Sequence, residues 1–514
     1  MHRLHLPEPR NASALAFADP ASAEAWLVGL APKPAQDALT LILEQIEAID
    51  SSDLPPPQAI ALLNLLRSAA VTRQAIAEGM FTRKALPMLA EEEHAFDVAQ
   101  QLWTRLGIAY LRLTPQCTPA NRCLPLLRAA TAFRVADHCH FVAARTRPAL
   151  LDALYLSLLT AAEANGVLRR PLADPDYPQY GKGTISGQLA WAFLLRTTDP
   201  YHLSAIQLQV INRAFSRWRE LLAFETLTGS RKHTYHLDLA KLLGAELPPE
   251  IPRYLDMRVV AHKLAQRIKG LQAGESPEAL KLGRSLSSAA AIRLLTDIEK
   301  HLHPRRDNSP PPNGELDLVF GGEDAYALLN NKTLNSLETE GAADRSISYQ
   351  RMAQFGFDRV SQMPTAVTKK LGIPSEHWRM IDGLAIRAPG TSEVRLLAPC
   401  LIAAKIDGQP KLGLMASLRA DHDGRLSARL RWLAGTVEAG TLKRLAPRGN
   451  KLVRVPAFVI RDGDTYSLIV PVDAGIRLGV VVELAGISLS EVELVPAEII
   501  ERGTDFIQYA CQPK

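Results

Sequence analysis

The sequence changes character between His301 and Gly314, and this change constrains the fold more than any other feature. Before it, apolar residues recur at helical spacing for roughly 300 residues. After it, short β-branched runs alternate with Gly, Pro, Asp and Asn roughly every eight to twelve residues. The segment between contains Pro310, Pro311 and Pro312, which lack amide hydrogens and can neither continue a helix nor join a sheet. The sequence therefore predicts an α+β protein whose all-helical N-terminal half precedes an antiparallel β-barrel.

The composition is that of an ordinary soluble globular protein. A chain of 514 residues is long enough for two or three domains. Of these residues, 47% are hydrophobic and 22% are charged. The net charge of +5 is mild, and Lys and Arg are scattered singly along the helices rather than gathered in blocks. Aromatic residues make up only 6% of the chain, so base-stacking platforms are not expected. We therefore expect no nucleic-acid partner.

The cysteines and the N-terminal sequence indicate a cellular compartment. Five cysteines without a CxxC pair are typical of free thiols in a reducing environment. The first residues contain no apolar segment of the kind that secretory signals carry. The most apolar stretch, residues 149–162, contains Asp152 and is shorter than the roughly 20 residues that span a bilayer. The sequence predicts a cytoplasmic protein with no membrane span.

The predicted organisation is an N-terminal arm at 1–30, a helical domain at 31–304, a linker at 305–314 and a β-barrel domain at 315–514. Ser204 and Gln207 form a capping box at the start of one helix, and residues 234–239 are predicted to form a lone strand. The predicted helices cover 22–30, 39–49, 60–66, 71–81, 95–111, 123–132, 135–144, 149–165, 189–195, 204–222, 256–270 and 289–301.

In the C-terminal half the apolar period shifts toward two. Three Asp-Gly dipeptides, at 407–408, 423–424 and 462–463, are hairpin-turn signals because glycine tolerates a positive φ. Successive hairpins with few helices between them favour a closed antiparallel barrel. The predicted strands cover 316–320, 377–387, 395–402, 411–418, 425–433, 452–460, 466–470, 479–484, 492–499 and 504–510.

Two short segments contain residue types that could carry chemistry. The loop 181–187, Gly-Lys-Gly-Thr-Ile-Ser-Gly, is similar to a phosphate cradle, but it follows a loop rather than a strand. A flexible loop that leads into a helix is the favoured interpretation. His138, Cys139 and His140 are metal-ligand types, but alternate residues on a helix point about 200° apart. The sequence contains no enzyme signature, and we expect no metal and no cofactor.

Several segments of the C-terminal half resemble PilZ domains. The segment 378–387 is similar to the strand that carries the (Asp/Asn)-x-Ser-x-x-Gly signature, and 426–433 is similar to a later barrel strand that ends in a basic residue and Trp. Further similarity to long proteobacterial PilZ-like proteins with helical N-terminal halves lies at 180–203, 412–418, 456–460 and 475–477. The resemblance implies a β-barrel in a signalling protein.

The resemblance also implies cyclic di-GMP as a ligand. PilZ domains grip it with an Arg-x-x-x-Arg arm and with the Ser and Gly of the second signature. Here Asp382 holds the acidic position, but Leu384 stands at the Ser position and Arg387 at the Gly position. The upstream arginines are spaced six and eight residues apart. The candidate residues for a non-standard site are Arg351, Arg359, Asp382 and Arg387.

Three functions remain open at this point. The favoured hypothesis is a non-enzymatic cytoplasmic signalling or adaptor protein, in which a degenerate PilZ-like domain acts through contacts with a partner protein. The alternative is a cyclic di-GMP receptor with a non-standard binding site. The second alternative is an enzyme with an unrecognised pocket.

Overall fold

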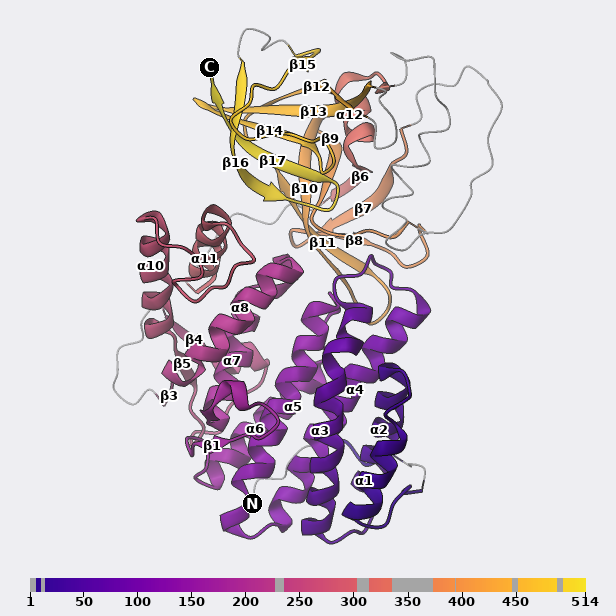
Figure 1. Ribbon diagram of the computed structural model, residues 1–514, viewed down its shortest axis with the longest axis vertical. Coiled ribbons are helices and arrows are strands. Elements are labelled where there is room, and N and C mark those ends of the chain that lie inside the picture. The colour runs from indigo at the N-terminus through magenta and orange to yellow at the C-terminus, as the bar shows by residue number, and fades with distance from the viewer. Residues whose placement is uncertain are drawn as a thin grey trace. The chain divides into compact units, whose positions relative to one another are not determined.

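The structure is a computed structural model and describes residues 6–10, 14–226, 235–302, 314–334, 373–392, 394–445, 452–487 and 493–514. The chain divides into two compact units. The helical unit consists of Met1–Lys84 and Met88–Asp307, and the β-rich unit consists of Ala85–Pro87 and Asn308–Lys514. The predicted fold class is confirmed, because helices fill the first unit and a closed antiparallel barrel lies in the second (Figure 1).

Long helices that lie side by side build the helical unit (Figure 1). Their contacts are close where small residues allow it. Gly107 in α4 lies against the Phe133 ring of α5, and a Cβ at Gly107 would overlap with that ring. The helices are α1 Pro20–Gly29, α2 Ala35–Asp50, α3 Pro56–Phe81, α4 Ala90–Leu113, α5 Cys123–Val142, α6 Ala149–Ala164, α7 Ile185–Thr197, α8 Ala205–Trp218, α9 Leu239–Leu243, α10 Arg258–Gln272 and α11 Ser288–Leu302.

Several of the predicted helix boundaries are wrong. Residues 60–66 and 71–81 belong to the single helix α3. Residues 123–132 and 135–142 belong to α5, which ends at Val142 instead of residue 144. Neither helix contains a Gly or Pro at the predicted break, so nothing there interrupts the backbone hydrogen bonds. The capping box of α8 is confirmed, because Ser204 N donates to Gln207 Oε1 at 2.9 Å and Gln207 N donates to Ser204 Oγ at 3.3 Å.

A buried ionic network joins α5, α6 and α7. Arg196 of α7 donates to Asp137 of α5 at 2.8 Å and to Asp152 of α6 at 2.7 Å. Arg147 lies 3.2 Å from Asp137, whose side chain is 1% exposed. Breaking a buried pair of this kind leaves an uncompensated charge, so the network fixes the relative position of the three helices.

Residues 234–239 were predicted to form a lone strand, but the strand has partners. β4 His236–Asp238 and β3 Ala223–Glu225 flank β5 Tyr254–Asp256 in a three-stranded antiparallel sheet. Phe224 and Leu255 are buried among the helices, and this buried side fixes the register of the sheet.

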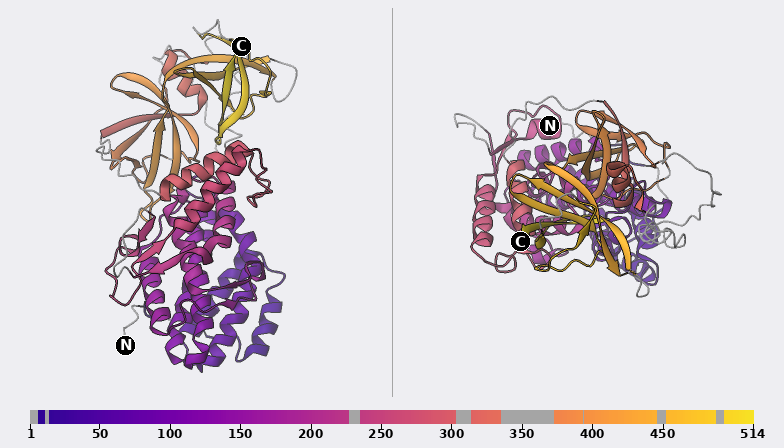
Figure 2. Two further views of the ribbon diagram at one scale, coloured as in Figure 1. Left: turned by 90° about the vertical axis from the view of Figure 1, so that its left-hand side faces the viewer. Right: turned by 90° about the horizontal axis from the view of Figure 1, so that it is seen from above.

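In the β-rich unit the first six strands form a closed barrel with the order β10-β11-β8-β7-β6-β9. Figure 2 shows the strands of this unit from two further directions. Asp407 and Gly408 join two of them with φ of +52° and +76°, as their dipeptide predicts. The barrel strands are β6 Gly314–Phe320, β7 Glu376–Ile381, β8 Leu384–Arg387, β9 Cys400–Ile406, β10 Gln409–Ala420 and β11 Leu426–Trp432.

A second antiparallel sheet follows the barrel, with the order β15-β12-β13-β14-β17-β16. Helix α12, Gly322–Asn330, packs against strands of both the barrel and this sheet, and Phe458 of β13 belongs to the core that they share. The strands are β12 Thr436–Leu445, β13 Leu452–Asp462, β14 Thr465–Pro471, β15 Leu484–Ala485, β16 Leu494–Arg502 and β17 Phe506–Pro513. Among the described residues, no helix is both long enough and apolar enough to cross a membrane.

Several strand predictions for the β-rich unit are wrong. Residues 395–399 and 479–483 were predicted to lie in strands, but β9 begins at Cys400 and β15 at Leu484. Residues 377–387 form the hairpin of β7 and β8 instead of one strand, because Asp382 and Gly383 turn the chain with φ of +50° and +77°. Strand β12 was not predicted, because Gly440 interrupts its alternation of apolar and polar residues. A Cβ at Gly440 would overlap with Ile487, so the approach of the chain near β15 requires glycine there.

We expect Trp378→Ala to destabilise the β-rich unit by about 3–5 kcal/mol, because the Trp378 ring is 0% exposed in the barrel. Urea unfolding followed by circular dichroism measures this loss. Trp432→Ala is the matched control, because Trp432 is half-buried against Gly413, and its cost should be clearly smaller. Equal costs would contradict the burial of Trp378 in this barrel.

Candidate functional site

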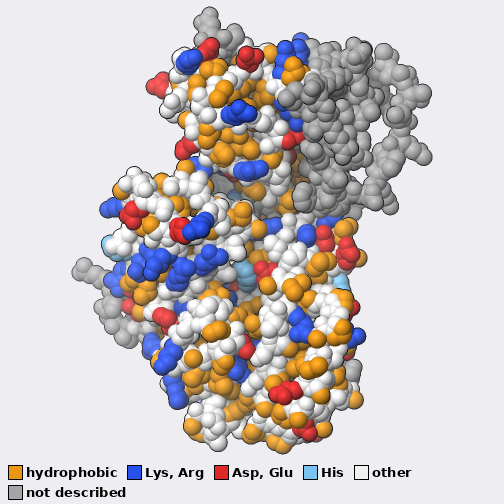
Figure 3. Space-filling model, in the orientation of Figure 1, with side chains coloured by type: hydrophobic (Ala, Val, Ile, Leu, Met, Phe, Trp, Pro, Cys, Tyr) orange, Lys and Arg blue, Asp and Glu red, His pale blue; other side chains and the backbone are white. Residues whose placement is uncertain are grey.

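Among the described residues of the helical unit, four arginines besides Arg196 are almost completely enclosed. Their residue exposures are 0% for Arg67, 7% for Arg128, 5% for Arg134 and 4% for Arg219. A guanidinium taken out of water costs several kcal/mol unless ion pairs, hydrogen bonds or aromatic faces compensate. Exposed arginines such as Arg213 and Arg217 of α8 carry no such cost. Figure 3 shows Lys and Arg side chains on the surface of the helical unit, where they form a blue band on its left side.

Arg67 of α3 is held by carboxylates from a distant loop. Its Nη1 and Nη2 donate to the two oxygens of Asp174 at 2.9 and 2.5 Å, and Nη1 also donates to Asp176. Ser68 Oγ donates to the second oxygen of Asp176 at 2.6 Å. The loop continues to Tyr177, whose ring centroid lies 5.3 Å from the Arg67 guanidinium. These contacts fix the loop against α3.

Aromatic rings and guanidinium groups alternate beyond this pair. The Arg134 guanidinium lies 3.7 Å from the centre of the Trp191 ring, and its Nε donates to Gln188 at 2.9 Å. Tyr180 meets Trp191 edge-on at 5.1 Å and stacks on Tyr177 at 5.7 Å. Stacking on aromatic faces partly replaces the water that the charge has lost.

Arg219, in the short 3-10 helix η5 Arg219–Leu221, completes this arrangement. Its guanidinium lies 5.8 Å from the Tyr180 ring, and its Nη2 donates to the Tyr180 carbonyl at 2.8 Å. We call Arg67, Arg134, Arg219, Tyr177 and Tyr180, together with Arg128, the arginine–tyrosine cluster. Arg128 is connected to Arg67 through Tyr110, whose phenol interacts with both guanidinium groups.

Within the arginine–tyrosine cluster, Arg128 has two buried donor atoms without a partner among the described residues, whereas Arg67 has one, its Nε. The two atoms of Arg128 are Nε and Nη1. Its charge lies near the Tyr110 phenol. Burial raises the pKa of Tyr110, and the charges of Arg128 and Arg67 oppose that rise. A buried guanidinium with free donors is costly, and a bound anion would satisfy it.

The loop 181–187, which is similar to a phosphate cradle, is bound by the carboxylate of Glu220 from the same chain. Thr184 caps α7, and the Glu220 carboxylate accepts from Thr184 N at 3.1 Å and from Thr184 Oγ1 at 2.7 Å. A Cβ at Gly187 would overlap with that carboxylate. The helix N-terminus favours negative charge, and Glu220 supplies it. Lys182 and Gly183 form the short strand β2, which pairs with β1 Leu172–Ala173.

The structure places two of the four site residues predicted from the sequence. Asp382 lies in the turn of the β7–β8 hairpin. Arg387 ends β8 and is 2% exposed, and its Nη1 donates to Glu376 Oε2 and to the Val394 carbonyl, each at 3.0 Å. Arg351 and Arg359 lie outside the described residues. Whether these four residues bind a ligand therefore stays a prediction.

Arg-x-x-x-Arg spacings occur after the signature strand, at Arg425 and Arg429 and at Arg444 and Arg448. Arg444 forms an ion pair with Asp473 at 2.9 Å, and Arg448 lies outside the described residues.

The histidines near Cys139 do not converge on one point. His138 lies 3.8 Å from Glu78, whereas His140 packs edge-on against Phe96 at 5.1 Å. The Cys139 thiol accepts from Gln74 at 3.5 Å, and burial raises its pKa well above the usual range. In the described part of the chain, these residues form no metal-ligand cluster.

Comparison with known proteins adds one finding. Residues 21–229 match the family model described as "Cyclic-di-GMP receptor FimW, N-terminal domain". The matched range contains the whole arginine–tyrosine cluster and ends before Asn308, where the main part of the β-rich unit begins. The search of curated proteins returned no match, and the search of solved structures returned none either.

The sequence analysis did not identify the arginine–tyrosine cluster. One signal was present, since Arg128 and Arg134 stand among apolar residues in a helix that is buried along nearly its whole length. A charge at such a position needs a partner, which marks it as structural or functional. The partners themselves were not visible, because Arg67 and Asp174 are 107 residues apart.

We expect Arg128→Met to leave the helical unit as stable as before or to stabilise it by about 1–4 kcal/mol, because methionine fills similar volume without an unsatisfied buried charge. Arg67→Met should instead cost about 3–5 kcal/mol, because Asp174 and Asp176 would lose their cation. Thermal and urea unfolding of the two variants measure the difference. If both variants are equally destabilised, Arg128 has a partner that this geometry does not contain.

Proposed function

We propose that this protein is a non-enzymatic cyclic di-GMP receptor, and that the arginine–tyrosine cluster of its helical unit binds the ligand. The observation that carries the proposal is the coincidence of two findings. The matched model describes the N-terminal domain of a cyclic di-GMP receptor, and the matched residues contain a buried guanidinium whose Nε and Nη1 lack acceptors.

The chemistry of the ligand fits the residue types of the cluster. Cyclic di-GMP carries two phosphodiester groups and two planar guanines. Guanidinium groups bind phosphate oxygens through paired, charge-assisted hydrogen bonds, and Arg128 has donors available for such bonds. Guanines stack on tyrosine rings and on guanidinium planes, and Tyr177 and Tyr180 already stack on each other at 5.7 Å.

Asp174 and Asp176 occupy the Arg67 guanidinium through charge-assisted hydrogen bonds that a phosphate could also make. Ligand entry therefore requires that the loop of Asp174–Tyr180 move away from α3, or that the ligand bind beside it through Arg128. In the first case, binding exchanges an internal anion for an external one. Such an exchange converts ligand binding into movement of a surface loop, which is what a receptor needs.

A second location for the same ligand is the PilZ-like site of Arg351, Arg359, Asp382 and Arg387. Arg387 would have to give up Glu376 and Val394 to bind there. The PilZ-like resemblance favours this location, so a variant of this site is included in the binding experiment described below.

A second candidate function is that of an adaptor that acts through protein contacts without a nucleotide. The β-rich unit exposes apolar side chains close together in sequence, including Leu478 at 52% and Val480 at 54%. Neighbouring exposed apolar groups are a feature of protein-contact surfaces. A receptor also has to pass its signal to a partner, so this surface is compatible with both functions.

Isothermal titration of the full chain with cyclic di-GMP tests the proposal. We expect Arg128→Met to weaken binding about 10- to 100-fold, since a hydrogen bond to a charged group contributes about 1.5–3 kcal/mol. Arg213→Met is the matched control, because it removes an exposed arginine from α8, and it should leave the affinity unchanged. Arg387→Met tests the PilZ-like location in the same way.

The outcomes separate the alternatives. Loss of binding in Arg387→Met with full binding in Arg128→Met would move the site to the barrel. Absence of binding by the unaltered chain would contradict the receptor function and leave the adaptor as the better explanation.

A further inference from the structure

A separate group of chemically active side chains lies on the small sheet of β3, β5 and β4. The register pairs Ala223 with Asp256 and His236 with Asp256, so these residues lie in one row across the sheet. Glu225 lies two residues from Ala223 and therefore points to the same face. Phe224 and Leu255 point to the opposite, buried face. The alternation of the strands thus gathers Glu225, His236 and Asp256 on one side.

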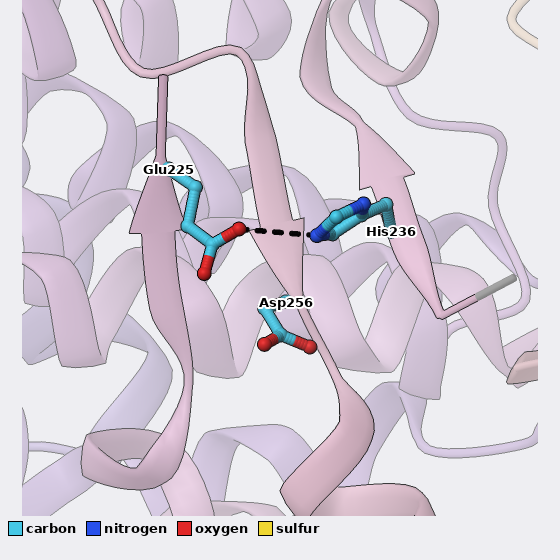
Figure 4. Close-up of side chains that lie close together, drawn as sticks. All are labelled: Glu225, His236 and Asp256. Carbon is cyan, nitrogen blue, oxygen red and sulfur yellow. Dashed lines mark hydrogen bonds and ion pairs between the residues drawn. The ribbon is translucent and has the colours of Figure 1, made fainter. Parts of the chain in front are cut away.

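The three side chains converge closely. One ligand atom from each, an imidazole nitrogen or a carboxylate oxygen, lies within 4.8 Å of the other two. His236 Nε2 is 3.1 Å from Glu225 Oε2, and Figure 4 shows the Asp256 carboxylate below this pair. The His236 side chain is 1% exposed, whereas Glu225 is 32% exposed, so the group is enclosed on one side and open on the other.

From this geometry we propose that Glu225, His236 and Asp256 bind a divalent transition-metal ion, with zinc as the best-fitting ion. Imidazole and carboxylate are ligands that zinc accepts, with bonds of about 2.0–2.2 Å. Atoms bound to one such ion lie about 3–3.5 Å apart, and the His236–Glu225 distance of 3.1 Å already agrees with this. Water completes the coordination from the open side.

Arg258 is the group with which the ion competes. Its Nε and Nη2 donate to Asp256 Oδ2 at 2.9 and 2.6 Å. The Arg258 side chain is 58% exposed, so it can swing into water without burying an unpaired charge. Metal binding replaces one positive charge beside two carboxylates with two, and this exchange favours the ion.

The metal would fasten a segment that leads into the arginine–tyrosine cluster. Strand β3 begins at Ala223, and Arg219 lies just before it in η5. Strand β5 is the central strand and continues through Met257 into α10. An ion shared by all three strands would therefore hold the chain on both sides of the sheet. This proposal does not depend on the ligand of the helical unit.

Zinc titration of the chelator-treated full chain, followed by calorimetry, tests the site. We expect one zinc equivalent whose affinity falls about tenfold or more in His236→Ala and in Glu225→Gln. His262→Ala is the matched control, because His262 is a histidine of α10 outside the group, and it should keep the affinity. Arg258→Ala should bind zinc more tightly, because the competing cation is gone.

A second readout does not depend on the stoichiometry. Zinc should raise the melting temperature of the unaltered protein and of His262→Ala, but not that of Glu225→Gln. If His236→Ala does not fold, Glu225→Gln and Arg258→Ala decide the question. The proposal is overturned if the unaltered chain binds no stoichiometric zinc, or if zinc binding is the same in Glu225→Gln and Arg258→Ala as in the unaltered chain.

Discussion

The cost of burying arginine governs the architecture of the helical unit. Arg67 and Arg196 are enclosed, and each is matched by two carboxylates that come from elsewhere in the chain. In a low-dielectric interior these pairs are strongly directional, so they determine where the carrying elements lie. The Arg67 pairs hold the loop of Asp174 against α3, and the Arg196 pairs join α5, α6 and α7. Apolar packing brings the helices together, and the ion pairs select one arrangement.

Arg128 departs from this rule, and this departure is the basis of the proposed ligand site. A fold stabilised only by packing and paired charges gains nothing from a guanidinium with two unsatisfied donors. A bound anion would offset this cost, and the match to a receptor-domain model over residues 21–229 covers this position. The barrel, which supplied the first resemblance, instead satisfies its enclosed Arg387 internally with Glu376.

Some features that depend on interactions between neighbouring residues were predicted correctly from the sequence. The capping box at Ser204 and the Asp407-Gly408 turn were predicted correctly, because each depends on a few neighbouring residues. Strand β12 was missed because Gly440 serves a contact with Ile487, which lies far away in the sequence. The arginine–tyrosine cluster was missed for the same reason. Its residues come from α3, α5, a loop and η5, and periodicity does not show which of them meet.

Arg219 and Glu220 are adjacent and form an ion pair at 3.0 Å, and each also contacts a further neighbour. Arg219 faces Tyr180 in the arginine–tyrosine cluster, and the Glu220 carboxylate caps the first turn of α7 through Thr184. Because the two side chains are ion-paired, a displacement of Arg219 would also disturb the carboxylate that caps α7. Amide hydrogen exchange in the first turn of α7 would therefore detect such a displacement.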